Sequence, residues 1–193
     1  VPGVLALAVM STAMVSLGIA TGFERGYGVL KRLGTTPLGR DRLVAAKIVS
    51  VLMIESLQAL VLVPVGIGLG WHLSSNGNAG SSAGQAIAVA LLATVGFGGL
   101  GLFLAGLLRA EVNLAATNGL YLVLLLLGGM IVPLARLPSG LAALAKSLPA
   151  AALSQGLHAT LGTGGAVPTE TWVALGAWSV IAPLAATLTF RWE

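Results

Sequence analysis

The sequence predicts an all-α protein whose helices cross a membrane as one bundle. Only 8% of its 193 residues are charged, whereas 56% are hydrophobic and 27 are glycine. A typical soluble domain carries roughly 25% charged residues, so this chain could not cover a water-facing surface. Its uncharged runs also reach the ~20 residues needed to cross ~30 Å of hydrocarbon. These observations exclude a soluble globular protein and indicate a polytopic helical membrane protein.

Five membrane spans follow when the apolar runs are divided at their polar and glycine-rich breaks. The connecting segments are short, and no linker marks a second domain. We therefore expect a single transmembrane domain over residues 1–193. Its expected spans are residues 2–22, 45–70, 85–108, 114–133 and 171–190.

The basic residues predict the orientation, because Lys and Arg collect on the cytoplasmic side of a membrane. Six of the ten lie between residues 24 and 47, and strict alternation of the spans places Arg109 and Arg191 on the same side. We therefore expect the start of the chain outside and its end inside. The odd number of spans and the absence of an initiator Met predict that a first span is missing.

The basic segment after the first span contains a short amphipathic pattern. Tyr27, Leu30 and Leu33 recur at helical spacing, with Lys31 and Arg32 beside them. Such a helix lies in the membrane interface and turns its cations toward anionic lipid headgroups or toward a partner. The alternative is an ordinary basic loop that follows the topology rule. Nucleic acid is excluded as a partner, because the basic residues lie beside apolar runs and form no solvated stripe.

Glu55 is an acid well inside the second expected span, and Gln58 shares its helix face. A carboxylate at membrane depth is costly and is usually paired, protonated or turned toward water. Structural pairing and contact with a cationic substrate or a proton therefore stay open. A smaller polar patch, Asn113, Thr117 and Asn118, opens the fourth span, where capping and helix contacts are the simpler explanation. Asn118 joins Glu55 and Gln58 as a candidate for a substrate path.

Small residues four positions apart predict close helix packing. The pairs Gly66/Gly70, Thr94/Gly98 and Gly101/Ala105 each lie on one helix face and allow another backbone to approach. Intramolecular packing and dimer contact are the alternatives. No metal site is expected, because the chain has no Cys and only two His residues, His72 and His158, without further ligands nearby.

The segment from residue 135 to 160 is apolar but interrupted. Pro138, Gly140 and Pro149 divide it into pieces of about ten residues, too short to span a membrane. Irregular backbone at membrane depth persists only where protein or water satisfies its polar groups. We expect a re-entrant helix pair that follows Pro133 and covers a cavity on the outer side; a surface loop is the alternative.

Two motifs give the sequence a family resemblance. Glu24-Arg25, Gly28-Val29-Leu30, Leu33, Thr36-Pro37-Leu38 and Arg40 resemble the pattern ER..G.L..L..TPL.R in the cytoplasmic loop of ABC transporter permeases of type 2. Gly128-Gly129, Pro133, Leu137-Pro138, Leu141, Leu144 and Leu148-Pro149 resemble the family's outer pair of short helices. The branch that it resembles most is the antibiotic-resistance permeases similar to the daunorubicin exporter.

The resemblance implies the permease subunit of an ATP-driven exporter in a bacterial plasma membrane. Such a permease has six spans, so the first would be absent here, and it works with a second copy or a sister permease. It would move a hydrophobic or amphiphilic drug, lipid or glycoconjugate. ATP and Mg would bind a separate nucleotide-binding subunit, since the chain has no G-x-x-x-x-G-K-[ST] motif and is not expected to be an enzyme. The implied coupling helix on that subunit contains Glu24, Arg25, Tyr27, Leu30, Lys31, Arg32 and Leu33.

Two other functions are alternatives to the permease. A passive membrane anchor or assembly factor explains the apolar composition but not the order of residues in the basic segment. An intramembrane hydrolase needs a nucleophile and a base in neighbouring spans. Ser139 and His158 are the tempting pair, and both lie in the outer segment without a Gly-x-Ser-x-Gly elbow.

Overall fold

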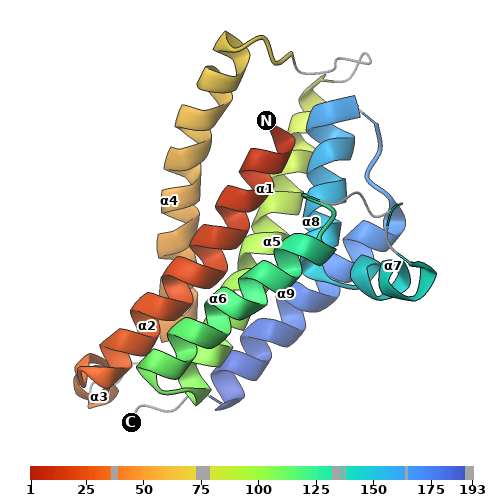
Figure 1. Cartoon of the computed structure of the whole chain (residues 1–193). Helices are drawn as coiled ribbons and strands as arrows, with labels where there is room; N and C mark the ends of the chain where they lie inside the picture. The colour runs from red at the N-terminus through yellow and green to blue at the C-terminus, as the bar shows by residue number, and fades with distance from the viewer. Residues whose placement is uncertain (36–38, 73–78, 132–135, 137, 164, 190–193) are drawn as a thin grey trace.

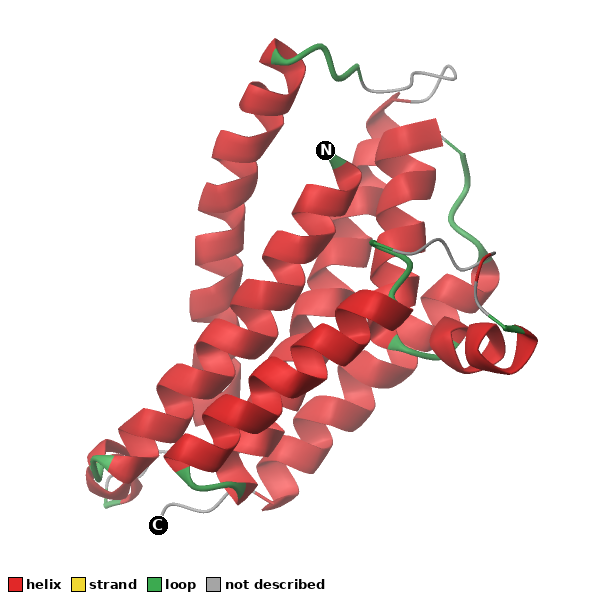
Figure 2. Cartoon of the chain, in the orientation of Figure 1, coloured by secondary structure: helices red, strands yellow, loops and turns green. Residues whose placement is uncertain are grey.

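The computed structural model describes residues 1–35, 39–72, 79–131, 136, 138–163 and 165–189, and these residues contain helices and no strand (Figures 1 and 2). Five of the helices are long and apolar enough to cross a membrane. The expected all-α class is thereby confirmed. In chain order the elements are α1 (Pro2–Met10), η1 (Ser11–Ser16), α2 (Leu17–Gly26), α3 (Val29–Gly34), α4 (Arg40–Gly68), α5 (Ala79–Leu107), α6 (Ala110–Leu127), α7 (Ser139–Lys146), α8 (Pro149–Leu157), η3 (His158–Thr163) and α9 (Thr169–Thr189).

The first span is longer than the sequence pattern predicted. α1, η1 and α2 run without a break from Pro2 to Gly26, with a π-helical stretch at Ser11–Ser16. The helix ends near Gly28, whose φ of 73° is a left-handed conformation that glycine adopts without a steric penalty. α4 likewise begins earlier than residue 45, at Arg40. Arg25 therefore lies within α2, and Arg40 and Arg42 lie within α4, instead of in the loop between the two spans.

α5 is the central helix of the bundle, and its glycine-rich stretch from Gly96 to Gly101 allows the neighbouring helices to come close. A Cβ on Gly99 would clash with the backbone of Ala182 and Pro183 in α9, and one on Gly96 would lie 3.4 Å from Trp178. A Cβ on Gly101 would lie 2.6 Å from the Met14 carbonyl oxygen of the first span. The absence of side chains at these positions is what permits helix axes to approach in a membrane.

The small-residue pairs of the sequence divide between packing and free surface. Gly101 meets Gly18, and Gly98 lies against Ile48 and Leu17, so these positions serve packing within the chain, as one alternative expected. Gly70 differs, because no atom lies within 4 Å of a Cβ placed there and its φ is 87°. It lies two residues beyond the end of α4 at Gly68 and so does not form a helix-packing pair with Gly66.

The basic segments gather at one end of the bundle. α3, the beginning of α4, the turn between α5 and α6, and the final turn of α9 lie at the lower end in Figure 1. Arg25, Lys31, Arg32, Arg40, Arg42, Lys47 and Arg109 are at this end. The alternation of the spans predicted this arrangement, in which Arg109 lies at the same end as the basic residues between 24 and 47.

The outer segment forms two helices of different character. α8 is buried at nearly every position, including Ala150, Leu153 and Leu157, and it packs against α1, α5 and α9. α7 is mostly exposed apart from Ala145. A surface loop is therefore the wrong interpretation for α8. Its helix is also longer than the piece of about ten residues expected, because η3 continues it to Thr163.

The prolines of this segment mark helix starts. Pro138 is the N-cap residue of α7, and Pro149 occupies the first turn of α8, where its missing N–H costs nothing. Trp178 of α9 donates a hydrogen bond from Nε1 to the Ser147 carbonyl oxygen, 2.8 Å away, and so ties the corner between α7 and α8 to the bundle. Pro133 lies outside the described residues.

We predict that Gly101→Ala destabilises the bundle, because the new Cβ would meet backbone atoms of Met14 that cannot rotate away. The expected loss is about 1–3 kcal/mol, as for other overpacked cores. It would be measured as unfolding in mixed micelles during titration with a denaturing detergent.

The matched control is Gly119→Ala, since a Cβ at residue 119 would meet no described residue outside its own stretch of helix within 4 Å. Alanine favours a helix over glycine by about 1 kcal/mol, so this variant should equal or exceed the wild type in stability. Close packing at Gly101 would be disproved by a Gly101→Ala protein as stable as the Gly119→Ala protein.

Candidate functional site

Two groups of residues singled out in the sequence lie at different levels of the bundle. The first surrounds α3 at the basic end. The second surrounds Glu55, half-way along α4. Each is described from its contacts.

α3 is attached to the bundle by apolar contacts on one face. Leu30 is fully buried and packs on Leu43 of α4, with Leu33 partly buried against the same pair. The helical spacing of Leu30 and Leu33 seen in the sequence is thus used for packing against α4.

Glu24 and Arg25 hold the base of α3 in place. The Glu24 carboxylate forms a hydrogen-bonded ion pair with the Lys47 ammonium of α4. Arg25 donates from Nη1 to the carbonyl oxygens of Ala105, 2.9 Å away, and Gly106 in the last turn of α5. A cation at this position also complements the negative end of the α5 dipole. These two side chains therefore connect α2 to α4 and α5.

The remaining members of the predicted coupling set face outward. Tyr27 is 78% exposed and stacks on Phe23, with ring centroids 6.1 Å apart. Lys31 and Arg32 are both exposed. We call Tyr27, Lys31 and Arg32 the α3 outer face. The sequence pattern treated all seven residues as one set, whereas the fold assigns four to attachment and three to a free surface.

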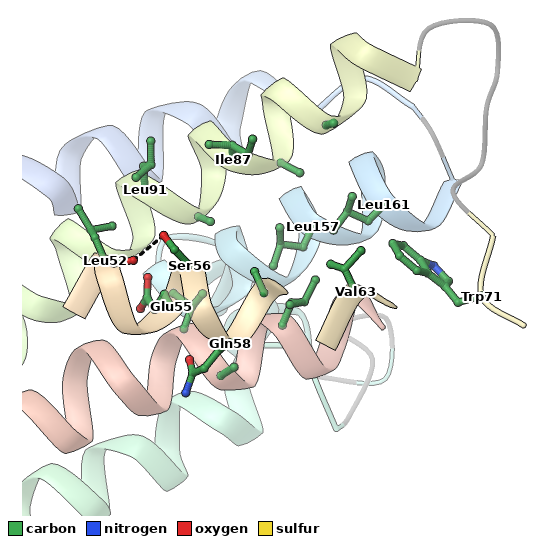
Figure 3. Close-up of a pocket in the computed structure, with 17 residues that line it drawn as sticks. Leu52, Glu55, Ser56, Gln58, Val63, Trp71, Ile87, Leu91, Leu157 and Leu161 are labelled. Atoms are coloured by element: carbon green, nitrogen blue, oxygen red, sulfur yellow. Dashed lines mark hydrogen bonds between the residues drawn. The ribbon is translucent and has the colours of Figure 1, made fainter. Parts of the chain in front are cut away.

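A cavity of about 320 Å³ lies beside Glu55 (Figure 3). α4 supplies one wall, including Leu52, Glu55 and Ala59, and the other walls come from α1, α5, α8 and η3. Trp71, which follows α4, is also in the lining. The walls are mainly Leu, Ala, Val and Ile side chains, so the carboxyl group of Glu55 stands in an apolar environment.

Glu55 is 9% exposed, and its two oxygen atoms differ. Oε2 accepts a hydrogen bond from the Thr94 hydroxyl of α5, whereas Oε1 is buried and has no partner among the described residues. Lys47, the nearest base along α4, pairs with Glu24 instead. The sequence left open whether Glu55 is paired structurally or contacts a substrate or proton. In the structure its only partner among the described residues is the uncharged hydroxyl of Thr94.

Gln58 also lines the cavity and links α4 to the first span. Its Nε2 donates to Thr12 Oγ1, 3.1 Å away, in the π-helical stretch. Sequence reasoning found Glu55 and Gln58 but missed Thr12 and Thr94 as their partners. Thr and Ser in apolar helices often bond within their own helix, so nothing in the local pattern distinguished these two.

Asn118 does not line the Glu55 cavity, and its place on a substrate path stays a prediction. It is exposed on α6, and its Nδ2 donates to the Leu114 carbonyl oxygen of the same helix. The buried members of that polar patch have a packing role, as expected. Asn113 donates from Nδ2 to the Gly18 carbonyl oxygen at 2.8 Å, and the Thr117 hydroxyl donates to Asn113 Oδ1.

The described residues form no metal cluster, and His158 and Ser139 each have a local structural role. No group of three His, Asp or Glu side chains gathers among them. The Nδ1 atom of His158 is bonded to the Ser154 carbonyl oxygen of its own helix, 2.8 Å away, and Ser139 begins α7 on the periphery.

Comparison with known proteins gives one family. The family model described as "ABC-2 type transporter" matches residues 1–161. This range includes α3, the Glu55 cavity and α8. No curated protein and no solved structure gives a significant match.

We predict that Arg25→Ala destabilises the protein by about 1–2 kcal/mol, because it removes charge-assisted hydrogen bonds to the end of α5. The double variant Lys31→Ala/Arg32→Ala is the control, since both side chains are exposed and surface changes usually stay within about 0.5 kcal/mol. Thermal unfolding in detergent measures both. Equal stability of the two variants would contradict the attachment role of Arg25.

Proposed function

Since the chain belongs to the ABC-2 type transporter family, whose membrane domains are permease components of ABC transporters, we propose that it is the permease subunit of an ATP-driven exporter. Its cargo would be a hydrophobic or amphiphilic compound, such as a drug, a lipid or a glycoconjugate. The family match carries this proposal, and the likeness of residues 24–40 and 128–149 to exporter motifs supports the direction. Similarity to the antibiotic-resistance branch supports a drug as cargo in a bacterial plasma membrane.

A separate nucleotide-binding subunit would supply the ATP chemistry. The sequence has no Gly-Lys pair and hence no phosphate-binding loop of the G-x-x-x-x-G-K-[ST] type. We assign the docking of that subunit to the α3 outer face, because Tyr27, Lys31 and Arg32 are exposed at the basic end. An exposed aromatic ring beside two cations is a suitable contact for a protein surface with acidic groups.

The attachment of α3 suggests how docking would be transmitted. Leu30 joins α3 to α4, while Glu24 and Arg25 join α2 to α4 and α5. α2 is continuous with η1 and α1, and α4 continues to Gly68, so both spans run from the docking end to the Glu55 cavity, where α1 and α4 supply walls. A displacement of α3 would therefore move these walls. Nucleotide would act by favouring one of two bundle arrangements.

A second copy of the chain, or a sister permease, would complete the transporter. α4 supports this, because most of its apolar surface is not buried within the chain. Met53, Leu57 and Leu60 are among its exposed apolar side chains. Membrane lipid would cover whatever the second permease leaves free.

We predict that the charge reversal Lys31→Glu/Arg32→Glu abolishes copurification of the nucleotide-binding subunit without lowering thermal stability, because the altered side chains are exposed. The control, Arg136→Glu/Lys146→Glu, makes the same change in net charge at exposed positions away from α3 and should copurify normally. Copurification that survives Lys31→Glu/Arg32→Glu would refute docking at the α3 outer face.

We also predict the sidedness of the two ends. The chain has no cysteine, so Thr35→Cys and His72→Cys each introduce a single thiol at an exposed position. In intact cells a membrane-impermeant maleimide should label residue 72, whereas residue 35 should react only after permeabilisation. The reverse pattern would place the α3 outer face out of reach of any cytoplasmic ATPase.

A further inference from the structure

The cavity beside α4 contains one carboxyl group, that of Glu55, in walls that are mostly apolar. Two further polar side chains of the lining already have hydrogen-bond partners. Ser56 donates to the Leu52 carbonyl oxygen, and the Gln58 amide bonds Thr12. Oε1 of Glu55 has no partner among the described residues, although the side chain lines the cavity and is more than nine-tenths buried. A buried acceptor without a partner is costly, so a ligand that donates a hydrogen bond to this atom would gain binding free energy there.

The charge and shape of the cavity define the chemistry of its occupant. An anion would be repelled by Glu55, and a hydrated divalent cation would need several more oxygen ligands than one carboxylate provides. A purely apolar molecule would leave Oε1 unsatisfied. A monocation with an N–H donor would satisfy this oxygen and neutralise the carboxylate, while its apolar part contacts the walls.

The position of Glu55 orients such an occupant. Glu55 lies toward one end of the cavity, and the lining follows α4 through Ala59 to Val63, about 12 Å further along the axis at 1.5 Å per residue. Trp71 lies beyond Val63, at the end of the lining away from Glu55 (Figure 3). A volume of about 320 Å³ is at the lower end of the range for small-molecule sites, roughly 300–1,000 Å³, and suits one small amphiphile.

We propose that this cavity, within a single copy of the chain, binds one amphiphilic organic monocation, with its ammonium N–H on Glu55 Oε1 and its apolar body along Ala59 and Val63 toward Trp71. The identification of this cation as cargo rests on the proposed permease function. The binding itself does not, because every residue that forms the site belongs to this chain.

The test uses two probes of the same shape. 4-Phenylbutylamine is a monocation at neutral pH, and 4-phenylbutan-1-ol is its uncharged counterpart. Binding of each to the full chain in lipid nanodiscs is measured by isothermal titration calorimetry, with empty nanodiscs to subtract partition into lipid. The wild type should bind the amine at least ten-fold more tightly than the alcohol.

Glu55→Gln removes the charge but retains an oxygen that accepts a hydrogen bond from Thr94. We expect it to weaken amine binding at least ten-fold and to change alcohol binding by less than about two-fold. The control is Glu170→Gln, which makes the same substitution at an exposed position at the start of α9 and should leave both affinities unchanged. Ala59→Leu partly fills the cavity and should weaken both probes.

Three results would overturn the inference: equal affinity of the wild type and Glu55→Gln for the amine, an equal loss for amine and alcohol, or Ala59→Leu binding both probes as the wild type does. The proposed permease function is judged separately by copurification of the nucleotide-binding subunit. Loss of that association with amine binding intact contradicts the function alone, whereas unchanged amine affinity in Glu55→Gln contradicts the cavity alone.

Discussion

The close approach of helices to the glycines of α5 is the constraint on which the rest of the bundle depends. Between helices in lipid, apolar surface gives little driving force, because the tails are as apolar as the side chains. Packing at backbone distance compensates for this. Gly99 receives α9, Gly101 receives the first span, and Gly98 lies against Ile48 of α4. Most of the described helices are thus positioned relative to α5.

This tight centre contrasts with the looser packing of α4. Only 17% of the most apolar stretch of α4 is buried within the chain, against 50% for that of α5. The cavity forms where α4 stands beside α1 and α5, and two polar links, Glu55 to Thr94 and Gln58 to Thr12, join α4 to its neighbours at that level. A wall held by a few hydrogen bonds can move more readily than one held by interlocked backbones. If α3 docks a partner as proposed, α4 is the cavity wall that a displacement of α3 would move.

The basic end combines attachment and exposure in one short segment. Leu30, Glu24 and Arg25 connect it to the helices that line the cavity, while the α3 outer face stays free. Rigid attachment is what a docking element needs if it is to transmit a movement. A loose basic loop would satisfy the topology rule equally well but would transmit little, and the described contacts of α3 distinguish the two.

The sequence by itself determined the fold class, the number of long apolar helices and the end at which the basic residues gather. These features depend on composition, span length and charge, which are local or additive properties. It also indicated the helical spacing of α3 and the cost of placing Glu55 in a span.

The tertiary structure decided which residues meet. Glu24 pairs with Lys47, Arg25 reaches α5, and Asn118 lies away from the cavity. It also decided that α8 is buried while α7 is exposed. Such contacts join residues far apart in the chain, and helical periodicity specifies which face a side chain occupies but not which helix lies opposite.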